Sequence, residues 1–259
     1  ENEGLDTELH LTINGGNINI NSGNDGINTN EDGVSVTTVN GGDLHIIAGL
    51  GAEGDGIDSN GYLVINGGTG VASANPGADA GMDSDLGSYI NGGLVIAMGS
   101  TMDWAESDSE QVTMNLQFAS NQSADAAVVV TRTDGTVIFA YDPGADEVLA
   151  ENSRVYSGAV ISTPNFHVGE TYHVYVDGEV TGQDVGGIYD PTTVTGYSGG
   201  GKKMIAQYGD ETRDTALDSP RIYGLTHMHK HLPEMQKVCG LSSAPLFTPI
   251  VADYYVGML

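Results

Sequence analysis

Short runs of alternating apolar and polar residues recur along the first 110 residues of the chain, and glycines separate them. The runs "LTI", "VTTV", "YLVI" and "SYI" are each followed closely by the triplet Asn-Gly-Gly, which begins at Asn14, Asn40, Asn66 and Asn91. A second apolar run follows each triplet: "NINI", "DLHII", "TGVAS" and "LVIAM". Alternation with a period of two predicts β-strands, and the glycines predict turns between them.

The triplets are spaced 26, 26 and 25 residues apart, and a third unit, "DGINTN", "DGIDSN" and "AGMDSD", repeats with them. Self-similarity at a fixed period indicates a solenoid, a propeller or an array. A propeller blade needs about 40 residues, so the period favours an all-β fold, a parallel β-helix with about 25 residues per coil. The alternative is an antiparallel sandwich with glycine-rich hairpins.

Stacking such coils places equivalent residues directly above one another. One predicted column points inward and is aliphatic: Ile13, Val39, Ile65 and Ile90. The next column is an amide ladder, made by the asparagines of the four triplets, in which each side chain bonds to the next coil. The glycines that follow allow the positive φ needed to turn a corner.

The rest of the chain loses the triplet. Residues 111–193 remain β-rich, with a hairpin expected about Asp134-Gly135, and we expect them to continue or cap the solenoid. From Lys202 onward, "KKMIAQY" and "LPEMQKVCG" carry helix signals and predict a short mixed α/β tail. The sequence therefore predicts three segments: 1–110, 111–193 and 194–259.

Charge separates the same segments. The chain has 35 acidic and 8 basic residues, a net charge of -27, and no Lys or Arg before residue 111. Residues 194–259 hold 6 acids and 6 bases, so the tail is neutral. This balance argues against nucleic acid or an anionic membrane as a direct partner. No apolar run is long enough to span a membrane, and Cys239 has no second cysteine with which to pair.

The third unit brings acids together without a cation. Its copies place short oxygen-bearing side chains at equivalent positions, and stacked coils about 4.8 Å apart would bring them close together. Calcium, which takes six to eight oxygen ligands, would relieve the repulsion. Turn propensity and adaptation to high salt are the alternatives, and neither explains the register. The predicted ligands are Asp25, Asn28, Asn30, Asp55, Asp58, Asn60, Asp83 and Asp85.

Other candidates carry less weight. The histidines of "HMHKHLPE", His227, His229 and His231, suit metal binding or proton transfer, and equally a solvated loop. The run "SGGGKK" suits anion binding at a helix start. Three aromatic residues near the acidic unit suit stacking on sugar rings, although such residues are more often packed: Tyr62, Tyr89 and Trp104.

The segments "LTINGGNINI", "GDGIDSNGYLVINGG" and "TYHVYVDGEVTG" resemble a family of secreted clostridial carbohydrate-binding modules, over about residues 5–190. The resemblance implies a right-handed parallel β-helix that holds calcium and binds acidic sugars such as polygalacturonate. The third copy departs from the pattern, because Ala80 stands where an acid is expected, and Asp79 is the candidate substitute ligand.

The tail resembles a different family. "VTGYSGGGKKMIAQY", "SPRIYGLTHMHKHLPEMQKVCGL" and "PLFTPIVADYYVGML" are similar to N-acetyl-γ-glutamyl-phosphate reductase over about residues 194–259. The family's histidine in "HKHLPE" matches His229 or His231, and Cys239 lies outside the catalytic motif. This resemblance implies an interior piece of that enzyme, without reductase activity of its own.

The sequence thus predicts a non-catalytic, calcium-dependent module that binds acidic polysaccharide, placed outside the cell or on its surface. A structural or adhesive solenoid with calcium only as a staple is one alternative, and a polysaccharide lyase on the same fold is another. A lyase base of the Lys or Arg type is missing from residues 1–110, which counts against the enzyme. Oligomeric state is left open.

Overall fold

The computed structural model describes residues 3–100, 103–146, 152, 154–197, 221–222 and 250–251, the last four by backbone alone. The chain divides into two compact units, residues 1–198 and 199–259. Nearly all regular structure among the described residues is strand, and the one helical element there is a 3-10 turn, η1 (Pro191–Thr193). The expected all-β class is confirmed. None of the helical structure in this part of the chain has the length and apolar character needed to cross a membrane.

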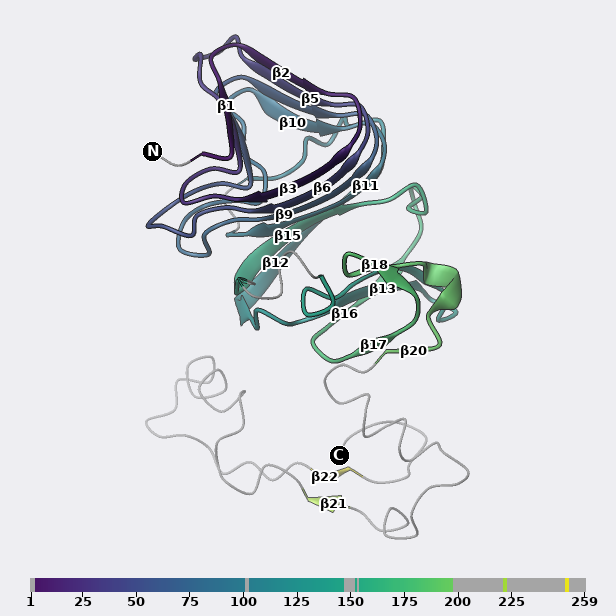
Figure 1. Ribbon diagram of the computed structural model, residues 1–259. Coiled ribbons are helices and arrows are strands. Elements are labelled where there is room, and N and C mark those ends of the chain that lie inside the picture. The colour runs from purple at the N-terminus through teal and green to yellow at the C-terminus, as the bar shows by residue number, and fades with distance from the viewer. Residues whose placement is uncertain are drawn as a thin grey trace, which may run out of the picture. The chain divides into compact units, whose positions relative to one another are not determined.

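Three parallel sheets form the first half of unit one (Figure 1). Each of the first three coils contributes one strand to every sheet, and the fourth coil contributes one strand to the second sheet and one to the third. All pairings within these coils are parallel, which supports the solenoid and excludes the antiparallel sandwich. The first sheet holds β1 (Leu5–Thr7), β4 (Ile27–Thr29) and β7 (Ile57–Ser59). The second holds β2 (His10–Ile13), β5 (Val36–Val39), β8 (Tyr62–Ile65) and β10 (Gly87–Ile90). The third holds β3 (Asn17–Asn21), β6 (Asp43–Ile47), β9 (Thr69–Ser73) and β11 (Leu94–Gly99).

Both predicted columns are present. The aliphatic residues of the second sheet pair in register along it and are at most 6% exposed: Ile13, Val39, Ile65 and Ile90. The asparagine amides bond from coil to coil, with Nδ2 to Oδ1 distances of 2.8, 2.9 and 3.0 Å. The second glycine of each triplet has positive φ, and a Cβ at Gly42 would lie 2.9 Å from the Gly16 carbonyl oxygen. Only glycine fits a turn stacked this closely.

The third sheet is largely buried on both faces from β6 to β11, whereas alternate residues of β3 are exposed. Ile46 and Ala97 point into the solenoid core, whereas Ile47 and Ile96 belong to a second core on the other side. Continuous apolar runs such as "LVIAM" are typical of strands covered on both faces. Two antiparallel strands extend this sheet beyond β11, in the order β15 (Tyr156–Ser162) and then β12 (Thr113–Gln122) (Figure 1).

The cap, residues 103–197 without this two-strand extension, is antiparallel. Its five-stranded sheet has the order β16-β13-β14-β19-β18, and β17 pairs separately with β20. The hairpin expected about Asp134-Gly135 is confirmed, since β13 pairs with β14 and Gly135 has a φ of 89°. The strands are β13 (Val128–Arg132), β14 (Val137–Tyr141), β16 (Tyr172–Val176), β17 (Val180–Thr181), β18 (Asp184–Val185), β19 (Ile188–Tyr189) and β20 (Gly196–Tyr197).

Polar contacts tie the solenoid to the cap. Asp146 is fully buried, and its Oδ2 lies 3.0 Å from Nδ1 of His45 in β6. The Tyr141 hydroxyl donates to the same oxygen at 3.4 Å. A Cβ on Gly186 would lie 2.3 Å from the His45 ring, so a residue without a side chain is needed at this position. Arg154 adds a second tie, because its guanidinium donates to the Ala48 carbonyl at 3.0 Å and to that of Gly49.

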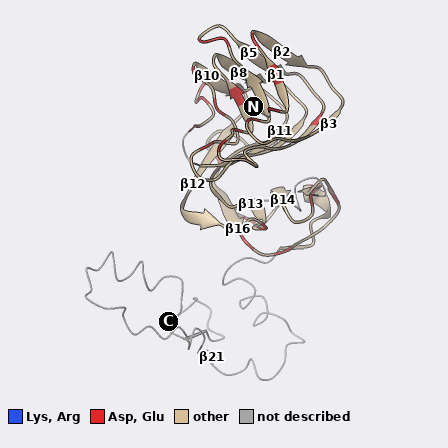
Figure 2. Ribbon diagram, turned by 60° about the vertical axis from the view of Figure 1, so that its left-hand side comes forward, with Lys and Arg blue, Asp and Glu red and all other residues tan. Residues whose placement is uncertain are grey.

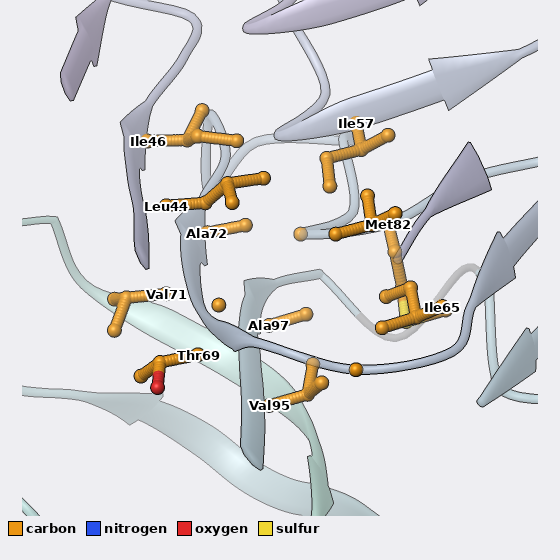
Figure 3. Close-up of a pocket in the computed structure, with 14 residues that line it drawn as sticks. Leu44, Ile46, Ile57, Ile65, Thr69, Val71, Ala72, Met82, Val95 and Ala97 are labelled. Atoms are coloured by element: carbon orange, nitrogen blue, oxygen red, sulfur yellow. The ribbon is translucent and has the colours of Figure 1, made fainter. Parts of the chain in front are cut away.

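The solenoid core contains a small apolar cavity of about 20 Å³ (Figure 3). Leu44, Ile57, Met82 and Val95 are among the residues that line it. Gly70, in β9, also lines the cavity, and a Cβ built there would meet no heavy atom within 4 Å. The cavity is therefore the space that a missing side chain at position 70 leaves.

In unit two the structure describes β21 (Arg221–Ile222) and β22 (Ile250–Val251), which pair antiparallel. The helices expected within "KKMIAQY" and "LPEMQKVCG" lie outside the described residues, so the mixed α/β tail stays a prediction. The same holds for the boundaries at 110 and 193.

Candidate functional site

The repeated acidic unit forms a row of carboxylates beside β4 and β7, at the turns that enter these strands. Asp25, Asp55 and Ala80 stack as aligned, since Gly26 N donates to Asp55 O at 2.9 Å and Gly56 N donates to Ala80 O at 3.0 Å. Each aspartate side chain also accepts from the next coil. Oδ1 of Asp25 accepts from Asp55 N at 2.8 Å, and Oδ1 of Asp55 accepts from Ala80 N at 2.5 Å. These carboxylates therefore join coils by satisfying backbone donors.

A second column runs along the strands themselves. Asn28 pairs in register with Asp58, and Asp83 follows in the next coil, where its backbone N donates to Ile57 O at 2.8 Å. Asn28 Oδ1 is buried without a hydrogen-bond donor among the described residues. Asp103 joins the row from beyond the repeats: Ser84 N donates to Asp83 Oδ1 at 2.8 Å and to Asp103 Oδ2 at 3.2 Å.

The third column consists mainly of amide contacts. Asn30 Nδ2 donates to Asp6 Oδ1 at 2.7 Å, and Asn60 Nδ2 donates to the Asn30 carbonyl at 2.9 Å. Asp85 is exposed. Asp79, the candidate substitute for Ala80, instead accepts from Gly54 N at 2.8 Å. The alignment of the repeats is thus reproduced, and four of the aligned aspartates, Asp25, Asp55, Asp79 and Asp83, accept backbone N–H groups through a side-chain oxygen.

Electrostatics alters the protonation of this row. Burial, reinforced by neighbouring carboxylates, raises the pKa of Asp55 to about 8 and that of Asp58 to about 7. Burial also raises the pKa of Asp25, and that of Asp103 to about 6. Figure 2 shows the acidic residues in red along the turns of the solenoid, with no Lys or Arg among them. Partial protonation therefore relieves the crowding that a cation was expected to relieve.

The expectation of calcium as the cofactor is wrong. Within the part of the chain that the structure describes, no group of three or more His, Cys, Asp or Glu side chains is arranged to hold a metal ion. The physical reason lies in the backbone bonds above, because oxygens that accept N–H groups of the next coil are not all directed at one point. The assignment of the nine individual residues to a site stays a prediction.

The predicted aromatic group is only partly assembled. Tyr62 and Tyr89 lie on adjacent coils of the second sheet, with ring centroids 6.2 Å apart and planes tilted by 47°. Tyr62 is 40% exposed. Trp104 packs against the solenoid core instead. The structure therefore brings two of the three aromatic residues together, and their contact with a ligand stays a prediction.

One polar cluster was missed from the sequence. His45, Asp146 and Tyr141 meet in the buried tie between solenoid and cap, yet His45 and Asp146 are 101 positions apart. Burial and the nearby Asp146 carboxylate raise the pKa of Tyr141 well above its ordinary value, so this hydroxyl stays protonated as a donor. No spacing or motif in the sequence joins these three residues.

Comparison with known proteins places the recognisable part of the chain at its C-terminal end. Residues 188–259 match the family model described as "Semialdehyde dehydrogenase, dimerisation domain". The match begins inside unit one, since β19, η1 and β20 lie between residues 188 and 197. No solved structure matches the chain.

The curated relatives are reductases. The chain is 46% identical over 67 residues to N-acetyl-γ-glutamyl-phosphate reductase of Rhizobium meliloti (strain 1021) and 47% identical over 70 residues to reductase 2 of Nostoc sp.. It is 48% identical over 67 residues to the reductase of Allorhizobium ampelinum. Each match covers 26% of this chain and 22% of the relative. The chain thus spans about a fifth of the length of these relatives.

These matches confirm the similarity of the tail to N-acetyl-γ-glutamyl-phosphate reductase, and the resemblance of residues 5–190 to a carbohydrate-binding module is unsupported. The expected function, calcium-dependent binding of acidic polysaccharide, is wrong, because the proteins that the chain matches are reductases. The same finding overturns the alternatives of an adhesive solenoid and a lyase, and the expectation that the chain is not an enzyme.

Two further expectations depended on the module resemblance and are corrected with it. The acidic polysaccharide partner is wrong, since the relatives are named for a small acyl phosphate. The expected extracellular or cell-surface location depended on the same resemblance, and the match to reductases overturns it. Both expectations were inferred from the acidic repeat, whose side chains instead form hydrogen bonds between coils.

Proposed function

We propose that the chain functions as a subunit of an N-acetyl-γ-glutamyl-phosphate reductase, and that residues 188–259 contribute its surface for association between subunits. The observation that carries the proposal is the coincidence of two matches on one segment. The family model describes a dimerisation domain, and reductases from three organisms are 46 to 48% identical to the chain over aligned stretches of 67 to 70 residues.

Charge supports the same segment as the place of substrate contact. An acyl phosphate of N-acetylglutamate is strongly anionic, and residues 1–193 hold 29 acids against Arg132 and Arg154. Such a surface repels the substrate, whereas residues 194–259 carry six of the eight basic residues. Lys202 and Lys203 follow the glycine run and suit the phosphate group.

The reaction needs a hydride donor and a proton-transfer group. Hydride adds to the acyl carbon, the bond from that carbon to the phosphate oxygen breaks, and inorganic phosphate leaves, so that an aldehyde remains. Histidine is the side chain best suited to proton transfer near neutral pH. We propose His229 and His231 for this role and for holding the leaving group.

The finer features of unit one belong to this proposal as well. We propose coils of about 25 residues wound as a right-handed parallel β-helix, supported by offsets of 26, 26 and 25 between bonded asparagines. The boundaries near residues 110 and 193 and a mixed α/β tail are proposed with them. In this account the acidic row serves to join the coils.

The test uses the full chain in the oxidative direction. N-acetylglutamate semialdehyde, inorganic phosphate and an oxidised nicotinamide cofactor are supplied, and formation of the reduced cofactor is followed by absorbance. His231→Asn should abolish phosphate-dependent turnover, whereas His10→Asn, an exposed position in β2, should not change it. Absence of turnover in the unsubstituted chain contradicts the reductase assignment.

Association is measured separately by light scattering. A mass of two chains is expected, and Phe247→Asp, in the apolar run "PLFTPIV", should shift it toward one chain. Gln207→Asp adds the same charge at a polar position of the segment and should leave the mass unchanged. A single-chain mass for the unsubstituted protein contradicts the proposed subunit surface, whatever the activity.

A further inference from the structure

Two tyrosines lie close together on the outer face of the second sheet, where β8 pairs with β10. Tyr62 of β8 pairs in register with Gly87 of β10, and Tyr89 lies two positions further along β10. The ring centroids are 6.2 Å apart, and Tyr62 is exposed whereas Tyr89 is half-buried. The proposed reductase reaction does not use this pair.

The segment that follows β11 returns to β10 and places an acid beside the rings. Ala105 forms a parallel bridge with Ser88, and Glu106 N donates to the Ser88 carbonyl at 2.8 Å. Ser88 and Ala105 are both buried. Because side chains alternate along a strand, Tyr89 and Glu106 both point to the outer face, next to each other.

Gly87 allows this close approach. A Cβ at Gly87 would lie 3.0 Å from Cε2 of Tyr89 and 3.1 Å from Cγ of Glu106, so the ring and the acid share the space over one glycine. Desolvation, reinforced by the Asp108 and Glu106 carboxylates, raises the pKa of the Tyr89 hydroxyl. The phenol therefore stays neutral, and its ring lies in a negative potential.

This potential has no internal counter-charge in the part of the chain that the structure describes. No Lys or Arg precedes residue 111, and the ion pairs between described residues involve other acids, Asp146 and Glu170. Glu106 is exposed. An aromatic ring beside a carboxylate favours an organic cation, since the ring face and the acid both attract positive charge.

Among organic cations, guanidinium fits this site best. It is planar, stacks on aromatic rings, pairs with a carboxylate through two N–H groups and is more weakly hydrated than ammonium. Ammonium would lose more hydration energy at such an exposed position. A quaternary ammonium group needs rings on several sides, whereas the described residues bring two rings together here.

Exposed apolar side chains extend the site across neighbouring coils. Val34, Tyr62 and Leu86 are 54, 40 and 42% exposed, and each lies within two residues of the start of β5, β8 or β10. These three strands lie side by side in register (Figure 2). With neighbouring strands about 4.8 Å apart, the stripe from Val34 to Glu106 spans roughly 14 Å, the length of about four extended residues.

We propose that Tyr62, Tyr89 and Glu106 recognise an arginine side chain carried by an extended, apolar segment of a partner protein. The guanidinium group stacks on the tyrosine rings and pairs with the Glu106 carboxylate. Apolar residues of the partner on either side of the arginine cover Val34 and Leu86. The site lies within unit one and does not rest on the proposed reductase function.

Charge and shape favour a polypeptide as the source of the guanidinium group. Residues 1–193 hold 29 acids against two arginines, so a basic segment is attracted to this unit and meets it faster. A free guanidino compound would gain the rings and the carboxylate but would leave the apolar stripe uncovered. The stripe therefore separates the two sources in an experiment.

The experiment titrates the full chain with the peptide acetyl-Leu-Arg-Leu-Arg-Leu-amide and measures the dissociation constant by calorimetry. The lysine counterpart of this peptide has the same charge and should bind about fivefold more weakly, because ammonium stacks less well on the rings. Methylguanidinium should bind at least about tenfold more weakly than the arginine peptide, because it buries none of the stripe.

Variants test the individual side chains. Tyr89→Leu should weaken binding of the arginine peptide about fivefold, the loss of one cation–π contact, and Tyr89→Phe should retain it. Glu106→Gln should weaken binding about threefold. Asp43→Asn removes the same charge at an exposed position of the third sheet and should change the affinity less than about twofold. Melting temperatures show that each variant is folded.

Several results would overturn the proposal. Absence of binding by the arginine peptide is one, and equal affinity for the arginine and lysine peptides is another, because net charge alone would then explain the attraction. Equal losses in Glu106→Gln and Asp43→Asn would have the same meaning. Methylguanidinium binding as tightly as the peptide would assign the site to a small molecule. Self-association that Tyr89→Leu abolishes would assign it to a second copy of the chain.

Discussion

The solenoid, residues 3–100, and the cap are both β-structure, yet different contacts hold them together. In the solenoid a residue bonds to its equivalent in the next coil, so aliphatic stacks on aliphatic and amide on amide. In the cap each strand pairs antiparallel with a different sequence, around buried aromatic residues such as Phe139 and Tyr141. The stability of the solenoid therefore comes from many repeated contacts that each contribute little. The stability of the cap depends on a few contacts that occur only once.

The sheet that both parts share makes this contrast testable. One face of β11 lines the solenoid core and the other lies in the core beneath the cap. A substitution on one side can therefore be compared with a substitution on the other within the same strands.

The buried tie between the two parts should give the largest effect. Asp146→Ala removes the acceptor of His45 and Tyr141 and leaves both groups buried. Leaving a buried hydrogen-bonding group without its partner costs about 1–3 kcal/mol, and two groups lose a partner here, so we expect a loss of roughly 2–5 kcal/mol in denaturant unfolding. Hydrogen exchange should rise in the cap before it rises in β5 and β8.

Asp108→Ala, at an exposed position, is the control and should change stability by less than about 0.5 kcal/mol. If Asp146→Ala matched this control, the cap would not depend on the tie.

The amide ladder should give an intermediate effect that depends on position. Asn66→Ala removes two side-chain bonds, and Asn14→Ala removes one. Because these amides are largely exposed, we expect about 1–2 kcal/mol for the first and about half of that for the second. Thermal unfolding of both variants measures the difference. Equal losses of stability in the two variants would show that the effect does not depend on the number of side-chain hydrogen bonds removed.

The carboxylate row should make solenoid stability depend on pH. Burial raises the pKa of Asp55 to about 8 in the folded chain from 3.8, so folding favours the protonated form. Its contribution is fully present below the unfolded pKa of 3.8 and is lost as pH rises through about 8. Asp55→Asn keeps an oxygen for Ala80 N and cannot ionise. We expect it to stabilise the chain by on the order of 1 kcal/mol at pH 8.5, after discounting for solvent screening, and to be near neutral at pH 4.

Melting temperatures across this range check the sign. Asp108→Asn removes one exposed charge and controls for the net charge of -27. If Asp55→Asn raised the melting temperature most at acid pH, the direction assigned to the pKa shift of Asp55 would be wrong.

How much the sequence predicts follows from the same contrast. A fixed offset between similar residues states which side chains stack, so the aliphatic and amide columns were predictable residue by residue. The alignment of Asp25 with Asp55 was equally accessible. The hydrogen-bond partners of these carboxylates could not be predicted. They are backbone N–H groups of the next coil, and the pattern of side chains carries no information about backbone donors.

Contacts without a repeat could not be predicted. Asp103 reaches Ser84 from outside the repeated unit, and His45 meets Asp146 across 101 positions. The solenoid core also holds a buried polar group, in which Thr29 Oγ1 donates to Ser59 Oγ at 2.7 Å. A pattern of apolar and polar positions assigns such residues to the surface. It cannot identify polar side chains that are buried because they form hydrogen bonds to one another.

The smallest effect should come from filling the solenoid cavity. Gly70 pairs in register with Leu44 and Val95, which line the cavity of about 20 Å³ with it, and it does not have positive φ. Gly70→Ala would add a methyl group to empty space, so burial and lower chain entropy should together stabilise the protein by about 1 kcal/mol. Gly81→Ala is the matched control, because Gly81 lines the same cavity but its Cβ would lie 2.3 Å from Met98 N and should destabilise. Denaturant midpoints of the two variants should therefore move in opposite directions. A loss of stability in both variants would contradict this prediction. It would mean that the solenoid core around position 70 has no room for an added methyl group.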